Sequence, residues 1–286
     1  MRRFESESAA LIKALPHIKA LRGKTIVVKY GGNAMINDAL KAAVIEDVVF
    51  MQTAGIPVVL VHGGGPEIEA MLKAVGKESH FINGLRHTDE ETMAIVQMVL
   101  CGKVNKDIVA LLETAGATAV GLSGIDGSLF QAEREKGADL GLVGKIHTVN
   151  VAFLKAIMQS GALPVVSSVA LGSGADRGIA LNVNADTAAA KIAAAIKAEK
   201  LILMTDVPGI LRNVHDPDSL ISNASLADID KLKKDGSITK GMIPKVDCCE
   251  IALHGGVKRA HIIDGRAPHA LLAELFTDEG IGTMIE

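Results

Sequence analysis

The chain is poor in aromatic side chains and carries no excess of positive charge. Its 286 residues include no tryptophan, one tyrosine and six phenylalanines, and 30 Lys and Arg residues stand against 33 Asp and Glu residues for a net charge of −3. Proteins that hold single-stranded nucleic acid stack its bases on aromatic rings, and binding to any nucleic acid draws on a basic surface. The composition therefore predicts that nucleic acid is not a partner.

Long apolar runs and paired cysteines are also missing. The longest apolar stretches, such as residues 56–61, are far shorter than the roughly 20 residues of a membrane-spanning helix, so a membrane is not expected as a partner. Residues 1–21 mix basic and acidic side chains and hold no continuous apolar segment of a secretory signal. Cys101, Cys248 and Cys249 have no CxxC spacing, which disfavours a zinc site or a disulfide framework and predicts a reducing, cytoplasmic location.

Glycine, in contrast, is abundant, and the chain alternates between short apolar segments and longer amphipathic ones. The 29 glycines are about 10% of the residues, against a usual value of about 7%. Continuous Val, Ile and Leu runs are typical of strands buried on both faces, so the alternation predicts an α/β fold with helical layers on both sides of a mainly parallel sheet. The predicted strands are residues 25–30, 56–61, 118–122, 163–167, 200–205 and 260–263. The predicted helices are residues 38–54, 89–114, 151–160, 185–198, 226–234 and 244–254, with a further helix that opens near Pro66.

Two segments interrupt this alternation. Residues 81–86 carry Asn-Gly between apolar residues, which predicts a hairpin, and residues 128–150 predict a second one. Either hairpin could cover a site or simply decorate the surface. The glycine-containing segment 171–180 is predicted to connect two halves of the molecule, residues 22–175 and residues 176–286.

The first 21 residues form a separate helical element. Pro16 predicts that this helix is kinked or split, because proline removes a backbone donor and clashes with the preceding turn. Its apolar stripe packs either on the chain's own surface or on a partner subunit, and the spacing alone leaves both open. The stripe consists of Ala10, Leu11, Leu15 and Ile18.

Glycines cluster directly after two of the predicted strands, at residues 31–32 and 63–65. Ligands of parallel sheets bind outside the carboxyl ends of the strands, where glycine lets backbone amides converge on an anion. Plain turns are the alternative, and two clusters favour anion binding. The sequence contains no complete P-loop, GxGxxG, GxSxG or HExxH motif, which disfavours the enzyme classes that use them.

Two lysines and an aspartate stand out near these clusters. Lys29 lies inside an apolar strand, where a charge is costly unless it is paired; an edge-strand lysine that reaches solvent is the alternative. Lys245 lies in the first turn of a predicted helix, where its charge opposes the helix dipole unless an anion lies between them. Asp186 follows Asn182 and Asn184, and these three residues either cap a helix or line a cleft.

Arg86 follows the Asn-Gly turn and carries the planar fork that matches a carboxylate. Exposure to solvent is the alternative for this side chain.

Five motifs, taken in order, resemble those of the N-acetylglutamate kinases, which are members of the amino acid kinase family. They are VKYGGNA at residues 28–34, VHGGGP at 61–66, NGLR at 83–86, NVNAD at 182–186 and GMIPK at 241–245. The resemblance runs from about residue 22 to the end. It implies the three-layer αβα sandwich of that family and phosphorylation of the γ-carboxylate of N-acetyl-L-glutamate by ATP with Mg²⁺, a step of arginine biosynthesis.

The resemblance also implies roles for single residues. Lys29 and Lys245 would stabilise the transferring phosphoryl group, and Asp186 would orient both lysines. Amides of Gly31, Gly32, Gly63 and Gly64 would bind the phosphoryl oxygens, while Gly64, Gly65, Arg86 and Asn182 would hold acetylglutamate. The nucleotide would lie against residues 205–210 and 237–245, with Thr205, Asp206, Gly209, Gly241 and Met242 as contacts.

Neither a general base nor a protein ligand for the metal is implied. A carboxylate acceptor with a pKa near 4.3 is already ionised at neutral pH. Magnesium would be held by the ATP phosphates and by water, as this ion prefers.

The first 21 residues resemble the extra helix of the arginine-inhibited members, which links dimers into hexameric rings. This implies a homo-oligomer, a dimer or a hexamer built as a trimer of dimers, and an L-arginine site that includes His261, Glu274 and Gly280. Glu274 would bind the arginine guanidinium, although a surface glutamate on a helix fits the sequence equally well. His17 stands where these enzymes often carry tyrosine.

Two other functions fit the sequence. One is a sister kinase that acts on N-acetyl-aminoadipate or carbamate, since a methylene changes binding by only about 1–3 kcal/mol. The other is an arginine-sensing module without catalytic activity.

Overall fold

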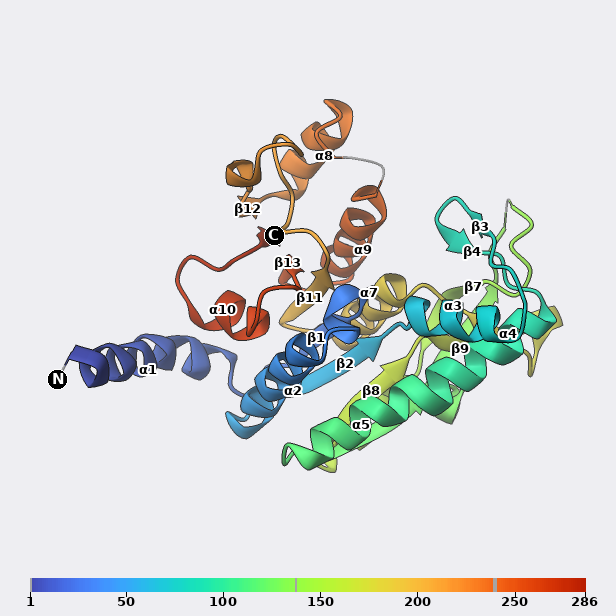
Figure 1. Ribbon diagram of the computed structural model, residues 1–286, viewed down its shortest axis with the longest axis horizontal. Coiled ribbons are helices and arrows are strands. Elements are labelled where there is room, and N and C mark those ends of the chain that lie inside the picture. The colour runs from blue at the N-terminus through green and yellow to red at the C-terminus, as the bar shows by residue number, and fades with distance from the viewer. Residues whose placement is uncertain (1, 137, 239–240) are drawn as a thin grey trace.

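The computed structural model describes residues 2–136, 138–238 and 241–286 of the chain (Figure 1). An eight-stranded sheet forms its centre, and all neighbouring strands are parallel except β13 and β14. In spatial order the strands are β12 (Asn223–Ala224), β14 (Thr283–Ile285), β13 (Arg259–Asp264), β11 (Lys200–Thr205), β1 (Ile26–Tyr30), β2 (Val58–His62), β8 (Leu163–Ser167) and β5 (Ala119–Ser123). The mainly parallel sheet is therefore confirmed.

Helices cover both faces of this sheet. On one face, α2 (Asp38–Thr53) packs against both α5 (Asn105–Thr114) and α10 (Ala270–Phe276), and Figure 1 shows α2 and α5 in front of the strands. On the other face, α7 (Ala185–Ile196) packs against α9 (Ile243–His254). The remaining helices are α3 (Gly65–Ala74), α4 (Glu90–Gln97), α6 (Val151–Gln159) and α8 (Leu226–Lys234). The three-layer α/β architecture is confirmed.

The strands form because their residues suit burial on both faces. Val27, Val28, Leu60, Val61 and Leu203 are all fully buried in the central strands. All six predicted strands are present, two of them at the predicted bounds, and the other four differ by one or two residues at one or both ends.

The predicted helix at residues 89–114 contains a feature that the apolar periodicity does not show. Between α4 and α5 the chain winds as a π-helix, η2 (Met98–Val104). A π-turn accommodates an extra residue without interrupting the apolar face, so the pattern still reads as one helix.

Both predicted hairpins are present. In the first, β3 (Phe81–Ile82) pairs with β4 (Leu85–Arg86), and Asn83 and Gly84 have φ angles of 52° and 81°, as a tight hairpin turn requires. The second consists of β6 (Phe130–Arg134) and β7 (Gly144–Val149).

The prediction of a connector at residues 171–180 is wrong. This segment belongs to β9 (Val169–Gly172) and β10 (Ala180–Asn182), an antiparallel pair within a four-stranded sheet of order β10-β9-β6-β7. The boundary predicted between residues 175 and 176 falls in the turn of this pair, at the 3-10 helix Gly174–Asp176. Glycines in a tight turn look the same in sequence as glycines in a linker. The sequence does not show that β9 and β10, on either side of this turn, pair with each other. The division of the chain into two halves remains a prediction.

The amino-terminal helix α1 (Arg2–Leu21) runs continuously through Pro16, so the expected split is wrong. Its second half packs against the body near α10, with Ile18 partly buried. Leu11 and Ile12 are 71% and 68% exposed. Figure 1 shows the helix extending away from the sheet. The stripe thus divides: one part packs on the chain's own surface and the other faces outward.

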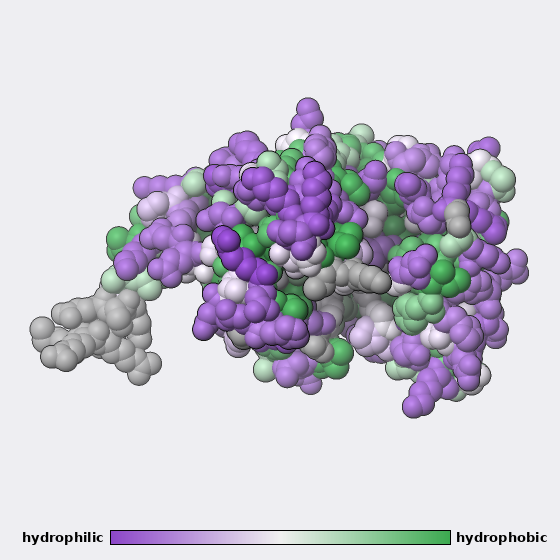
Figure 2. Space-filling model, turned by 90° about the horizontal axis from the view of Figure 1, so that it is seen from above, coloured by the Kyte–Doolittle hydropathy of each residue, from purple (hydrophilic) through white to green (hydrophobic). Residues whose placement is uncertain are grey.

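Hydrophilic side chains cover most of the face shown in Figure 2, and apolar ones appear there as scattered patches. Among the described residues, no helix combines the length and the apolar character needed to cross a membrane.

Candidate active site

The sheet brings the two glycine clusters together. Strands β11, β1 and β2 are parallel neighbours, so their carboxyl ends lie side by side. Residues 31–32 follow β1, residues 63–65 follow β2, and Asp206 follows β11. Helix α7 begins at the same edge, because a Cβ on Gly63 would lie 3.5 Å from the Cβ of Ala185. The site is therefore built from three strand ends and one helix N-terminus.

Helix α7 begins where it does because Asn184 caps it. The side chain of Asn184 accepts a hydrogen bond of 3.0 Å from the amide of Thr187. This cap places Asp186 in the first turn, where a carboxylate also complements the helix dipole.

Asp186 holds Lys29 and Lys245 on its two oxygens. Lys29 Nζ lies 3.0 Å from Oδ1 as an ion pair without the alignment of a hydrogen bond, and Lys245 Nζ donates to Oδ2 over 3.2 Å. Asp186 is 8% exposed. Burial raises the pKa of Asp186, but the charges of Lys29 and Lys245 outweigh this effect and hold the pKa below its ordinary value.

The carboxylate therefore stays ionised between two ammonium groups, and the cluster carries a net charge of +1. β1 is a central strand, so the alternative of an edge-strand lysine is wrong for Lys29.

The glycines of the first cluster make room for these charges. A Cβ on Gly31 would lie 2.7 Å from Lys29 Nζ. Gly32 has a φ of 70°, and a Cβ there would lie 2.7 Å from Asp206 Oδ1. A side chain at either position would collide with a charged group, which is a reason for glycine besides turn formation.

A pocket of about 200 Å³ lies beside the second cluster. Gly63, Gly64 and Gly65 form part of its lining, together with Arg86 of the β3–β4 hairpin and Asn182 of β10. The hairpin thus contributes to the wall of a pocket instead of only decorating the surface. Four residues of the acetylglutamate site implied by the motifs meet here.

Arg86 is held firmly at this pocket. It is 8% exposed, so the alternative of a solvent-facing arginine is wrong. Nη1 donates to Glu69 Oε2 over 2.8 Å and to Ser79 Oγ, and the guanidinium lies 4.7 Å from the centre of the Phe81 ring. Asn182 donates to Thr88 Oγ1 over 3.1 Å. Glu69 and Ser79 were not expected from the sequence, because no motif marks them.

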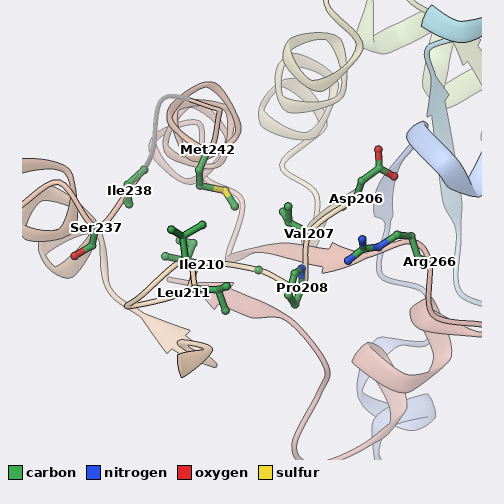
Figure 3. Close-up of a pocket in the computed structure, with 11 residues that line it drawn as sticks. Asp206, Val207, Pro208, Ile210, Leu211, Ser237, Ile238, Met242 and Arg266 are labelled. Carbon is green, nitrogen blue, oxygen red and sulfur yellow. The ribbon is translucent and has the colours of Figure 1, made fainter. Parts of the chain in front are cut away.

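A larger and mostly apolar pocket of about 390 Å³ follows β11 (Figure 3). Asp206, Gly209 and Met242 line it, as expected of nucleotide contacts, together with Val207 and Ile210. Thr205 and Gly241 are not in its lining. Thr205 is buried, and its hydroxyl lies 2.9 Å from the carbonyl oxygen of Val207, so its contacts are internal. Residues 239 and 240 of the expected nucleotide segment lie outside the described residues.

The three residues of the implied arginine site meet at Glu274. His261 Nδ1 lies 2.5 Å from Glu274 Oε1, and Glu274 Oε2 accepts hydrogen bonds from the amides of Ile281 and Gly282. Glu274 is 8% exposed, so the alternative of a surface glutamate is wrong. Gly280 adjoins the same carboxylate, since a Cβ on Gly280 would lie 2.9 Å from Glu274 Oε2, and it lines a cavity of about 430 Å³ between α1 and the segment after α10.

The sequence model of the amino acid kinase family matches residues 24–264. The chain belongs to the amino acid kinase family. It is 55% identical to the acetylglutamate kinase of Clostridium kluyveri over 99% of both chains. It is 56% identical to the acetylglutamate kinase of Caldanaerobacter subterraneus over 96% of this chain and 91% of that one. Similarity of this extent places the chain among the acetylglutamate kinases, which confirms the resemblance of the five motifs.

Solved structures share the fold. The N-acetylglutamate synthase of Neisseria gonorrhoeae, complexed with coenzyme A and N-acetyl-glutamate, is 29% identical with a TM-score of 0.84 over 97% of this chain and 63% of that one. This chain therefore spans less than two thirds of the synthase. Carbamate kinase from Giardia lamblia bound to AMP-PNP is 18% identical with a TM-score of 0.69, covering 92% of this chain and 98% of that one, and shows the shared fold.

Proposed function

We propose that the enzyme transfers the γ-phosphoryl group of ATP to the γ-carboxylate of N-acetyl-L-glutamate, in arginine biosynthesis. The observation that carries this proposal is the pairing of one buried carboxylate with two lysines at the carboxyl edge of the sheet. The names of the relatives support the acceptor.

The roles of the charged residues follow from the chemistry of the transfer. Phosphoryl transfer depends on positioning and on stabilising charge that spreads over the phosphoryl oxygens. Lys29 and Lys245 would neutralise this charge, and Asp186 keeps their ammonium groups on opposite sides of one carboxylate. The amides after β1 and β2 would add donors. The acceptor carboxylate is ionised at neutral pH, so none of these residues needs to remove a proton from it.

The two pockets fit the two substrates. The small pocket offers glycine amides, the Asn182 amide and the Arg86 guanidinium, which suit an acylated amino diacid. The apolar pocket after β11 suits an adenine ring. In the part of the chain that the structure describes, no three His, Cys, Asp or Glu side chains are grouped to hold a metal ion. We expect Mg²⁺ to arrive with ATP, held by phosphates and water, and to neutralise phosphate charge.

A coupled assay of ADP release tests the acceptor. With MgATP we expect turnover of N-acetylglutamate, and much slower turnover of N-acetyl-aminoadipate and of carbamate, because both differ from it in length and a methylene alone changes binding by about 1–3 kcal/mol. An enzyme that turned over either alternative acceptor but left N-acetylglutamate unchanged would be a sister kinase. A folded protein that is inactive on all three acceptors would favour the alternative function, an arginine-sensing module without catalytic activity.

Arg86→Lys is expected to raise the KM for acetylglutamate about 10- to 100-fold, the range set by losing one charged hydrogen bond of about 1.5–3 kcal/mol. Lysine keeps the positive charge but lacks the planar guanidinium, whose several N–H groups can donate to Glu69 and to a substrate carboxylate at the same time. Steady-state kinetics with each substrate varied measures the effect, and the KM for ATP is the internal control. An unchanged KM for acetylglutamate would show that Arg86 does not bind a carboxylate of this substrate.

We also propose that arginine inhibits the enzyme from the cavity between α1 and the segment after α10. His17 lies 3.1 Å from Asp278 across this cavity, so ligand binding there would alter the contact between α1 and the body. Glu274 would need to exchange one of its internal hydrogen bonds in order to bind the guanidinium. A structure of the related synthase with coenzyme A and L-arginine, 28% identical with a TM-score of 0.80 over 97% of this chain and 65% of that one, supports a search for this ligand. The outward-facing Leu11 and Ile12 support assembly of dimers into a hexamer through α1.

A further inference from the structure

His62 connects the second glycine cluster to the interior of the protein. It is the last residue of β2 and is fully buried. Its Nδ1 lies 2.9 Å from the carbonyl oxygen of Gly63, and its Nε2 lies 3.0 Å from Nδ2 of Asn105. Both nitrogens of the ring are therefore engaged, one by the glycine segment and the other by α5.

Asn105 decides which ring nitrogen carries the proton. Its Nδ2 also lies 2.9 Å from the carbonyl oxygen of Val165 and 3.2 Å from that of Leu122. An amide nitrogen only donates, and only the nitrogen of this amide can face two carbonyl oxygens. His62 Nε2 faces a group that only donates, so it accepts and shares the two amide hydrogens with the two carbonyl oxygens. The Gly63 carbonyl oxygen only accepts, so Nδ1–H donates to it. Burial lowers the pKa of His62 to about 4, so the ring is neutral at physiological pH.

The bond to Gly63 orients the next amide. In a trans peptide the C=O of one residue and the N–H of the next point in opposite directions. With the Gly63 carbonyl held toward the imidazole ring, the N–H of Gly64 points away from the ring. Gly64 lines the small pocket, and the proposed function places its amide on the reacting oxygens.

We infer that His62 and Asn105 are positioning residues for the transfer: Asn105 orients the His62 ring, and His62 holds the Gly63–Gly64 peptide with its N–H directed at the reacting group. The inference rests on the proposed function and extends it to two residues that touch neither substrate. Donors that stabilise a transition state are effective only when their direction is set in advance.

The π-helix supports this arrangement from the same side. Asn105 follows η2 directly, and within η2 the Cδ2 of Leu100 would lie 2.7 Å from a Cβ on Gly64. A side chain on Gly121 of β5 would overlap Asn105 Oδ1, so glycine at this position leaves room for the Asn105 side-chain amide. One helical segment thus packs against both the glycine cluster and the histidine that holds it, and π-turns recur at functional sites.

A purely structural role is the competing explanation, and the chain offers a matched control for it. Gln52 bridges the residues that precede β5 and β8, because its Nε2 donates to the carbonyl oxygens of Thr118 and Gly161 over 3.2 and 3.1 Å. These carbonyls lie at the amino ends of the two strands, away from the glycine clusters. Gln52→Leu removes a comparable pair of hydrogen bonds without touching His62.

The test compares four variants by kcat, by the KM for ATP and by thermal unfolding. His62→Leu and Asn105→Leu are expected to lower kcat about 10- to 100-fold, the cost of misplacing a catalytic donor, with little change in the KM for ATP. His62→Asn is expected to keep most of the wild-type kcat. Its amide nitrogen is bonded to Cγ, as Nδ1 of histidine is, and can still donate to the Gly63 carbonyl oxygen. Gln52→Leu is expected to lose stability but to keep the wild-type kcat.

The inference fails if folded His62→Leu has the wild-type kcat, or if His62→Asn is as impaired as His62→Leu. Should the leucine variants not fold, ¹⁵N NMR of the imidazole in the wild-type protein decides the matter. We expect a neutral ring with a slowly exchanging proton on Nδ1, and a proton on Nε2 would overturn the arrangement. A wild-type enzyme inactive on acetylglutamate would refute the proposed function while leaving this NMR result intact, so the two failures are distinguishable.

Discussion

Lys29→Ala and Lys245→Ala are each expected to lower kcat by about a thousandfold, the upper range for losing one donor that stabilises a transition state. Each change removes one of the two positive charges beside Asp186 and leaves the carboxylate with a single partner. The net charge of the cluster falls from +1 to 0, so the spreading charge on the phosphoryl group is met by one ammonium instead of two. Single-turnover measurements, with the enzyme in excess over MgATP and with saturating acetylglutamate, report this step directly.

Lys24→Ala is the matched control for these variants. Its Nζ lies 3.3 Å from Glu199 Oε1, and its side chain is 44% exposed. Lys24 precedes β1, so the change breaks an ion pair at the amino end of the sheet, opposite the glycine clusters, and it should leave kcat unaltered. Wild-type turnover by a folded Lys29→Ala or Lys245→Ala protein would remove that lysine from the mechanism. Thermal unfolding separates loss of chemistry from loss of fold, and Asp186 keeps one lysine partner in each variant, so it is not left as an uncompensated buried charge.

Deletion of residues 1–20 is expected to convert a hexamer into dimers and to raise the arginine concentration for half-inhibition at least about tenfold, the effect of losing about 1.4 kcal/mol of binding free energy. The deletion removes the outward-facing Leu11 and Ile12 and one wall of the cavity beside Gly280. Light scattering measures the mass, and ADP release at increasing arginine measures the inhibition. The proposed active site lies at the carboxyl ends of β1, β2 and β11, so turnover without arginine should persist.

A double variant, Leu11→Ser with Ile12→Ser, separates the two effects. It removes the two most exposed apolar side chains described in α1 but keeps Ala10, Lys13 and His17 on the cavity wall. We expect dimers that still bind arginine, although more weakly. An unchanged mass after the deletion would contradict assembly through α1, and unchanged inhibition would place the inhibitor elsewhere.

Much of the fold is encoded in local pattern, and the exceptions share one cause. The six predicted strands exist because Val, Ile and Leu runs have no other low-energy place than a sheet covered on both faces. The Asn83-Gly84 hairpin is equally local, since its two positive φ angles suit these residue types. The segment 171–180 was misjudged because its role depends on β6 and β9 lying side by side, about 40 residues apart in sequence.

The candidate site divides in the same way. The cost of burying a lone charge predicts that Lys29 has a partner, and the motif order points to Asp186, but only the fold shows 3.0 Å between them. No sequence motif predicts that Glu274 is buried or that Glu69 forms an ion pair with Arg86. Both depend on side chains that approach from other elements.

The sequence by itself determined the alternation of strands and helices, the glycine clusters after β1 and β2, and the family of the enzyme. These properties depend on residue type and spacing, which act over a few neighbours. Only the tertiary structure decided that two lysines share one carboxylate, that Arg86 is held by Glu69, and that His62 is gripped between Gly63 and Asn105. Apart from the bond between His62 and its neighbour Gly63, these contacts join residues from 17 to more than a hundred positions apart. Their geometry exists only once the parallel strands have brought their carboxyl ends to one edge.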